Sequence, residues 1–142
     1  MPIISTDIVY RLSGGASNTD VNASLGGAKS STSVGTGLHD LCDVVGSAEA
    51  ATGDTEYRCV YVHNNHGTLT MQSAKIWISS NTPSTDTSVE IALGSSAVNG
   101  TETSVANENT APSGPTFSAP ASEGAALSIG DIPAGQHKAV WI

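Results

Sequence analysis

Histidine is the side chain best suited to bind a metal or carry a proton near neutral pH. The chain has four: His39, His63, His66 and His137. His63 and His66 are three positions apart, so a turn could direct both imidazoles at one metal ion. No cysteine and no third histidine follows at the spacing that a zinc site needs. We therefore expect His63 and His66 to be polar turn residues that cap backbone groups.

Carboxylates gather in the middle of the chain, at Asp40, Asp43, Glu49, Asp54 and Glu56. A calcium loop takes its oxygen ligands from alternating, closely spaced positions, around a glycine that allows a sharp turn. The run from His39 to Asp43 lacks that alternation. We expect these carboxylates to form a solvated acidic face that holds no metal.

The chain is rich in serine, but no serine stands in the Gly-x-Ser-x-Gly turn that exposes a nucleophile. The glutamates that could pair for glycoside hydrolysis lie on unrelated segments: Glu90, Glu102, Glu108 and Glu123. The double glycines Gly14–Gly15 and Gly26–Gly27 lack the Lys-Ser/Thr of a phosphate-binding loop. We predict no catalytic residue, no cofactor-binding residue and no metal ligand, and hence that the chain is not an enzyme.

The two cysteines, Cys42 and Cys59, are too far apart in sequence to form a close metal-binding pair. We expect two free thiols, with Cys59 packed in a strand as a small apolar side chain. A disulfide between them remains an alternative, because sequence spacing cannot exclude it.

The formal net charge is −8, and the five basic residues are scattered singly along the sequence. Binding to nucleic acid requires a basic stripe or patch, so direct nucleic-acid binding is not expected. No run approaches the roughly 20 apolar residues that span a bilayer, and the N-terminus shows no secretory signal. We expect no membrane insertion.

Short apolar runs punctuated by turn residues predict strands near residues 56–63, 69–78, 87–93, 126–129 and 137–142, after an extended opening at 3–12. Run 56–63 should be central, because it is apolar on both faces. Residues 38–51 predict one short helix from a thin apolar stripe. The pattern indicates an all-β protein, a single antiparallel β-sandwich of immunoglobulin-like or jelly-roll-like form. We expect its core to include Val60, Val62, Ile76, Ile78, Val89, Ile91, Leu93, Leu127, Ile129 and Val140.

Residues 13–37 are dense in Gly, Ser, Asn and Thr and show no period. A structureless loop of that length is uncommon in a compact domain. We therefore predict that residues 1–37 form an extended arm and residues 38–142 the sandwich. The sequence also stops inside an apolar strand, which predicts either a truncated chain, which we favour, or an edge paired by a neighbouring subunit.

Three sets of motifs resemble a family of small, mostly uncharacterised virion proteins of tailed bacteriophages. They are Tyr10–Ala16 with Asn22–Gly27, Gly53–Arg58 running into Asn64–Thr70, and Ile132–His137. The likeness covers most of the chain and consists of turns and strands. Ile132–His137 also resembles the penultimate turn of immunoglobulin-like domains.

The resemblance implies a structural component of a tailed-phage virion, present in many symmetric copies and assembled in the host bacterial cytoplasm. It would act through protein–protein contacts with other virion proteins and with copies of itself, as a capsid decoration, head–tail or tail protein. Family members continue past the equivalent of Trp141–Ile142 into another strand. The alternative is a carbohydrate- or receptor-binding β-sandwich of a phage fibre or spike, with Trp77, Trp141, Tyr57 or Tyr61 as stacking platform.

Overall fold

The computed structural model describes residues 1–142 and is all-β, as the sequence predicts. Its strands are β1 Ile8–Leu12, β2 Cys59–Asn64, β3 Met71–Ile76, β4 Ala92–Leu93, β5 Leu127–Ile132 and β6 His137–Trp141. Helical structure is confined to α1, Ser47–Thr52, and to 3-10 turns at Ser5–Asp7, Val21–Ala23 and Glu123–Ala125. No helix reaches the length and apolarity needed to cross a bilayer.

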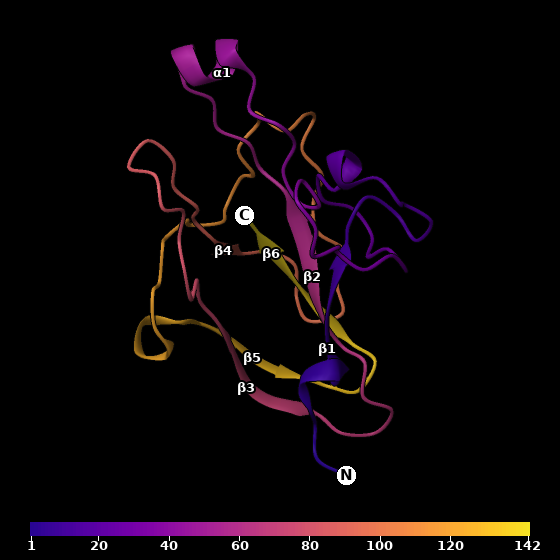
Figure 1. Cartoon of the computed structure of the whole chain (residues 1–142). Helices are drawn as coiled ribbons and strands as arrows, with labels where there is room; N and C mark the ends of the chain where they lie inside the picture. Colours follow the sequence, from indigo (N-terminus) through magenta and orange to yellow (C-terminus); the bar gives the residue numbers. More distant parts are fainter.

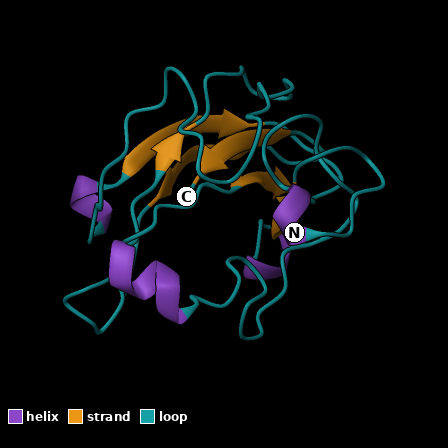
Figure 2. Cartoon of the chain, turned by 90° about the horizontal axis from the view of Figure 1, so that it is seen from above, coloured by secondary structure: helices purple, strands orange, loops and turns teal.

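The strands form two antiparallel sheets (Figure 1). The main sheet has the order β1-β2-β6-β4, and the second pairs β3 with β5. The second sheet packs on one face of the main sheet, while long loops surround the strands on the other sides (Figure 2). Whether this two-stranded layer belongs to an immunoglobulin-like or jelly-roll-like sandwich stays a prediction.

Strand β2 is central, as its two apolar faces predict. It lies between β1 and β6, and all six of its residues are buried. Alternation divides its side chains between two clusters. Cys59 and Tyr61 pack with Trp141 on what we call the Tyr61 face, and Val60 and Val62 pack towards β3 and β5 on the Val62 face.

Two predicted elements are shorter than expected. Of the strand predicted at 87–93, Ala92–Leu93 forms β4, and Ile91 makes a single bridge to Ser118. The helix predicted at 38–51 is wrong in its bounds, because α1 spans Ser47–Thr52 and none of its residues is buried. Leu38 is 87% exposed, so the apolar stripe has no surface to pack against.

The prediction of an extended arm at residues 1–37 is wrong. Strand β1 lies inside that range and pairs with β2, and the segment that follows it folds back over the Tyr61 face. The Ser13 hydroxyl donates to the Cys59 carbonyl at 2.7 Å, and the Tyr61 hydroxyl donates to the Gly27 carbonyl at 2.6 Å. This segment has no apolar stripe; hydrogen bonds of polar side chains and close backbone contacts attach it to the sheet instead. At Gly26 a Cβ would meet the Thr103 carbonyl at 2.4 Å.

A buried carboxylate fastens the loops on the Tyr61 face. Glu102 is 3% exposed and accepts from the backbone N–H groups of Ser95 (3.0 Å) and Ser96 (2.8 Å) and from the Trp141 indole (3.3 Å). Burial alone would raise the pKa of Glu102, but these hydrogen bonds outweigh it and hold the pKa below its ordinary value. The Glu102 backbone N–H in turn donates to the Tyr61 hydroxyl at 2.9 Å.

The last strand has a neighbour on both sides within the main sheet. Strand β6 lies between β2 and β4. Beyond it, Ile142 and Arg58 exchange two backbone hydrogen bonds, at 2.8 and 2.9 Å.

Candidate docking groove

A groove opens where β1, at the edge of the main sheet, faces the β3–β5 pair. Its volume is about 450 Å³, and eight of the ten residues that line it are hydrophobic. The lining residues are Ile8, Tyr10, Val62, Met71, Ala74, Lys75, Ile76, Trp77, Ser79 and Ile129. We refer to this feature as the docking groove.

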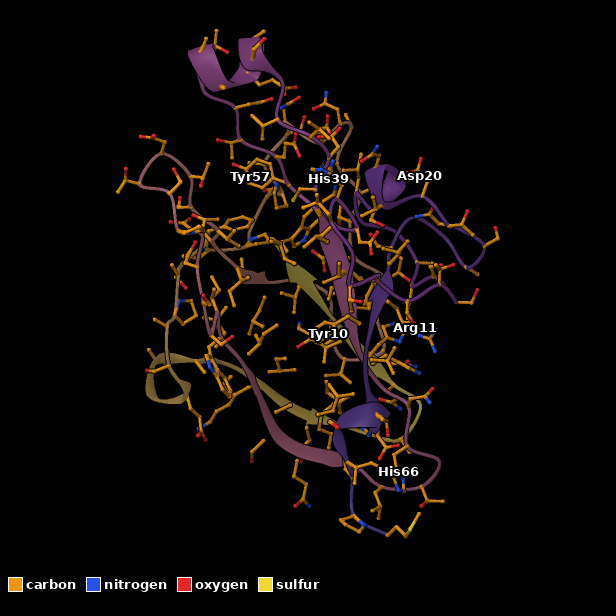
Figure 3. The ribbon with its side chains drawn as sticks, viewed as in Figure 1. Tyr10, Arg11, Asp20, His39, Tyr57 and His66 are labelled. Carbon is orange, nitrogen blue, oxygen red and sulfur yellow. The ribbon has the colours of Figure 1, made fainter.

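Strand alternation places one wall of the docking groove. Tyr10 lies opposite Val62 in the register of β1 and β2, so both side chains point to the Val62 face. In Figure 3 Tyr10 and Arg11 extend to opposite sides of β1, with Tyr10 towards the second sheet. The side chains of Ile8 and Tyr10 are 39% and 45% exposed, so this wall is open to solvent.

A β-bulge forms the other wall. The register of β3 against β5 shifts between Met71 and Ala74 and again at Lys75, and Ser73 has a φ of 49°. The Ser73 N–H donates to the Asp131 carboxylate at 2.8 Å, which holds the irregular turn of the backbone. A bulge interrupts alternation, so consecutive residues from Ala74 to Trp77 can all line the groove.

The four aromatic residues proposed from the sequence as stacking platforms differ in their exposure to solvent. Trp141 and Tyr61 are fully buried, and Tyr57 packs edge-on against Phe117 at 5.4 Å between ring centroids. Trp77 is 40% exposed at the docking groove. Trp141 and Tyr61 are thus core residues, and Tyr57 packs partly buried against the same cluster. Tyr10, which the sequence interpretation did not single out, lines the groove together with Trp77.

Comparison with known proteins does not assign the chain to a family. No family model, no curated protein and no solved structure matches it.

His66 acts as a turn residue, as the sequence predicts. Its Nδ1 accepts from the backbone N–H groups of Thr68 (3.1 Å) and Leu69 (3.0 Å). His63 does not share this role, because it is 8% exposed in β2 and lies opposite His137 in β6. The two histidines that the sequence placed in one turn are thus separated by the fold.

The acidic segment is not simply a solvated face. Carboxylate oxygens of Asp43, Glu56 and Glu108 lie within 4.8 Å of one another. Beside them the fully buried Arg58 pairs with Glu108 at 2.6 Å and with Glu56 at 3.4 Å. Burial raises the pKa of Glu56, and the charge of Asp43 adds to this, while Arg58 opposes it. Glu56 and Glu108 thus neutralise a buried guanidinium, while Asp43 adds a further negative charge beside them.

Both thiols are free. Cys42 is exposed, whereas Cys59 is fully buried in β2, and burial raises the pKa of Cys59 to about 12. A thiol so rarely ionised is a poor nucleophile, so Cys59 serves in packing, as the sequence predicts.

A polar hollow of about 320 Å³ lies on the outer side of the loop that follows β1, where Figure 3 labels Asp20 and His39. Its carboxylates are committed to backbone groups. Asp20 accepts from the Asn22 N–H at 2.9 Å, and Asp40 accepts from the Gly37 N–H. The hollow is therefore explained as loop structure.

Proposed function

We propose that this chain is a non-enzymatic assembly module that binds an extended segment of a partner protein in the docking groove. The observation that carries the proposal is the groove itself, with eight hydrophobic residues of ten and two half-exposed aromatic side chains, Tyr10 and Trp77, at its walls. Large apolar side chains gathered at one open groove are a feature of interaction surfaces.

The chemistry of the partner follows from the strands beside the groove. Strand β3 pairs with β5 alone, so its outer edge presents unpaired backbone N–H and C=O groups next to the apolar lining. An extended segment can hydrogen-bond to such an edge and place alternate side chains in the groove. The net charge of −8 favours a neutral or basic partner over an acidic one.

The narrower form of the proposal is a structural component of a tailed-phage virion, with partners among other virion proteins and copies of itself. Its support is the resemblance of the turn and strand motifs. Its test is to label the chain and image intact particles. Ordered copies on the capsid, the head–tail junction or the tail are the expected result, and particles without the chain would contradict it.

Binding of a carbohydrate is the second candidate, because Trp77 and Tyr10 could stack on a sugar ring. Sugars also need convergent hydrogen-bonding groups, and the groove offers the side chains of Lys75 and Ser79 besides the Tyr10 hydroxyl. The apolar lining therefore favours a peptide.

The experiment uses displayed random peptides, selected on the whole chain, with affinity measured by the fluorescence of Trp77. Trp141 is fully buried and gives a constant background. We expect selected peptides to alternate apolar residues and to lose at least tenfold in affinity with Tyr10→Ala or Trp77→Ala, the latter followed by calorimetry, since buried aromatic anchors dominate such interfaces.

Val44→Ala is the matched control, because Val44 is 64% exposed and lies outside the groove. Its affinity should equal that of the wild type. Peptides that bind equally well to the Tyr10→Ala and Trp77→Ala variants would refute the docking groove. A saturable glycan-array signal that depends on Trp77 would favour the second candidate.

A further inference from the structure

Four nitrogen-bearing side chains lie on or over the Tyr61 face, on the opposite side of the main sheet from the docking groove. His63 and His137 are directly paired across β2 and β6, and Arg11 pairs with Tyr61 one step further along β1. The edge of the Tyr61 ring meets His137 at 4.8 Å between centroids. Lys29, from the loop over this face, lies close enough to lower the pKa of both imidazoles.

Arg11 and Lys29 form no ion pair, and the buried carboxylate of Glu102 on the same face is already hydrogen-bonded to Ser95, Ser96 and Trp141. The three ion pairs of the structure use Arg58 and Lys75. Arg11 donates through Nη1 to the Ser31 carbonyl (2.5 Å) and the Ser33 hydroxyl (3.1 Å), and Lys29 donates to its neighbour's carbonyl at 3.4 Å. In a chain of net charge −8, two cations thus lie together and unneutralised.

The same place holds most of the buried polar atoms that lack a hydrogen bond. Five such side-chain atoms exist in the chain, and three of them are Arg11 Nε, His63 Nδ1 and His137 Nδ1. A buried polar group without a partner destabilises the fold, so three such atoms on one face of the main sheet point to an absent binding partner.

The hydrogen bond of His137 fixes what that ligand must be. His137 Nε2 lies 3.2 Å from the Gly100 carbonyl, which can only accept, so Nε2 carries the proton of the neutral ring. Nδ1 is then a bare acceptor and becomes a donor when the ring gains a second proton. The charges of Arg11 and Lys29 disfavour a metal cation at Nδ1 and favour an anion.

We propose that Arg11, Lys29, His63 and His137 form a proton-coupled binding site for one oxyanion, a phosphate or a carboxylate group. The anion accepts a hydrogen bond from Arg11 Nε and, once the His137 ring has taken up a proton from solvent, a second one from His137 Nδ1. This site is independent of the docking groove, because the main sheet separates them.

The proton coupling has a definite direction. Burial lowers the pKa of His63, and the charges of Lys29, Arg11 and His137 lower it further, while the Gln136 backbone opposes them. Burial also lowers the pKa of His137, with Lys29 adding to the effect and the Gly100 carbonyl opposing it. A bound anion reverses the electrostatic contribution, so anion binding must raise the imidazole pKa values and must tighten as pH falls.

The test is an NMR titration of the imidazole nitrogens of the whole chain with sulfate and, separately, with acetate. Sulfate stands for a phosphate group and keeps its charge between pH 5.5 and 7.5, so any pH dependence belongs to the protein. We expect saturable shifts at His63 and His137 with at least one probe, and a dissociation constant at least tenfold lower at pH 5.5 than at pH 7.5. The probe that binds more tightly identifies the class of oxyanion.

Variants distinguish a site from general salt effects. Lys29→Gln should weaken binding at least fivefold, and circular dichroism should show that the variant is folded. His137→Gln retains a donor for Gly100 and should weaken the pH dependence, leaving the part that His63 contributes. His39→Asn removes an exposed imidazole elsewhere and should change nothing. Binding that ignores pH or Lys29→Gln, or no saturable shift with either probe, would overturn the proposal.

Discussion

The buried carboxylate of Glu102 joins separate parts of the fold, and Glu102→Gln tests how much it stabilises the protein. It joins two backbone N–H groups of the loop after β4 to the Trp141 indole, through contacts of 2.8–3.3 Å. Glutamine has the same shape but one acceptor oxygen. The amide NH₂ of glutamine must therefore face at least one of the three N–H donors from which Glu102 accepts a hydrogen bond, and two donors cannot bond to each other.

The expected loss follows from these contacts. A hydrogen bond to a charged acceptor contributes about 1.5–3 kcal/mol, and a buried donor left without a partner costs about 1–3 kcal/mol. One bond is lost outright, and the other two become neutral and weaker. Glu102→Gln should therefore lower the free energy of unfolding by about 2–4 kcal/mol, a large part of the stability of a domain of this size.

Urea unfolding, followed by tryptophan fluorescence, measures this change, because Trp141 is buried beside the carboxylate. Glu90→Gln is the control, since the same chemical change at an exposed glutamate should alter stability by less than about 0.5 kcal/mol. If Glu102→Gln unfolds at the same urea concentration as Glu90→Gln, the hydrogen bonds to Glu102 do not stabilise the fold and the reasoning fails.

The pH dependence provides a second check. The folded-state pKa of Glu102 lies below its ordinary value, so its contribution is fully present above the pKa of the unfolded carboxyl and is lost as pH falls through the folded-state pKa. Glu102→Gln should flatten this part of the acid limb of the stability curve. An unchanged acid limb would contradict the assignment.

Two further predictions concern the thiols and the N-terminal segment. A thiol reagent should modify Cys42 alone in the native protein and should reach Cys59 only after denaturant is added. Rapid labelling of both cysteines in the native protein would show that β2 does not shield Cys59 from the reagent. Deletion of residues 14–34 should prevent cooperative folding, because it uncovers the Tyr61 face and removes the acceptor at Gly27; a deleted chain that unfolds with an unchanged urea midpoint would restore the free-arm interpretation.

The sequence predicts those parts of the fold that apolar periodicity controls. Strand β2 was identifiable as central because β-branched and aromatic residues occupy both of its faces. The core role expected for Val60, Val62 and Val140 is confirmed, since all three are buried in one cluster. Strand β5 is found where Leu127 and Ile129 predicted it, although it runs on to Ile132.

The N-terminal segment was misjudged because backbone and serine hydrogen bonds hold it, and these leave no period in the sequence. Ser13, Ser24 and Ser30 are as fully buried as the core valines. Serine is usually exposed, so its burial becomes visible only when its partner, such as the Cys59 carbonyl for Ser13, is known.

The two candidate sites were also beyond the reach of sequence spacing. Arg11 and Lys29 seemed scattered because their positions in sequence say nothing of the loop that returns over β1. His63 and His137 are 74 positions apart, and only the antiparallel pairing of β2 with β6 sets them side by side. The alternation of residues in β1 indicates the face on which Tyr10 lies. The opposite wall of the docking groove depends on a bulge in β3, and no sequence motif predicts that bulge.

The position of β6 has a consequence for synthesis of the chain. Strand β2 must wait for its second neighbour until residues 137–141 have been translated, some 75 residues later, and β4 has no partner in the main sheet before then. The sheet therefore cannot close while the ribosome is still elongating the middle of the protein. Until then one edge of β2 exposes unpaired backbone N–H and C=O groups. Nascent chains on one polysome can pair with each other through these edges.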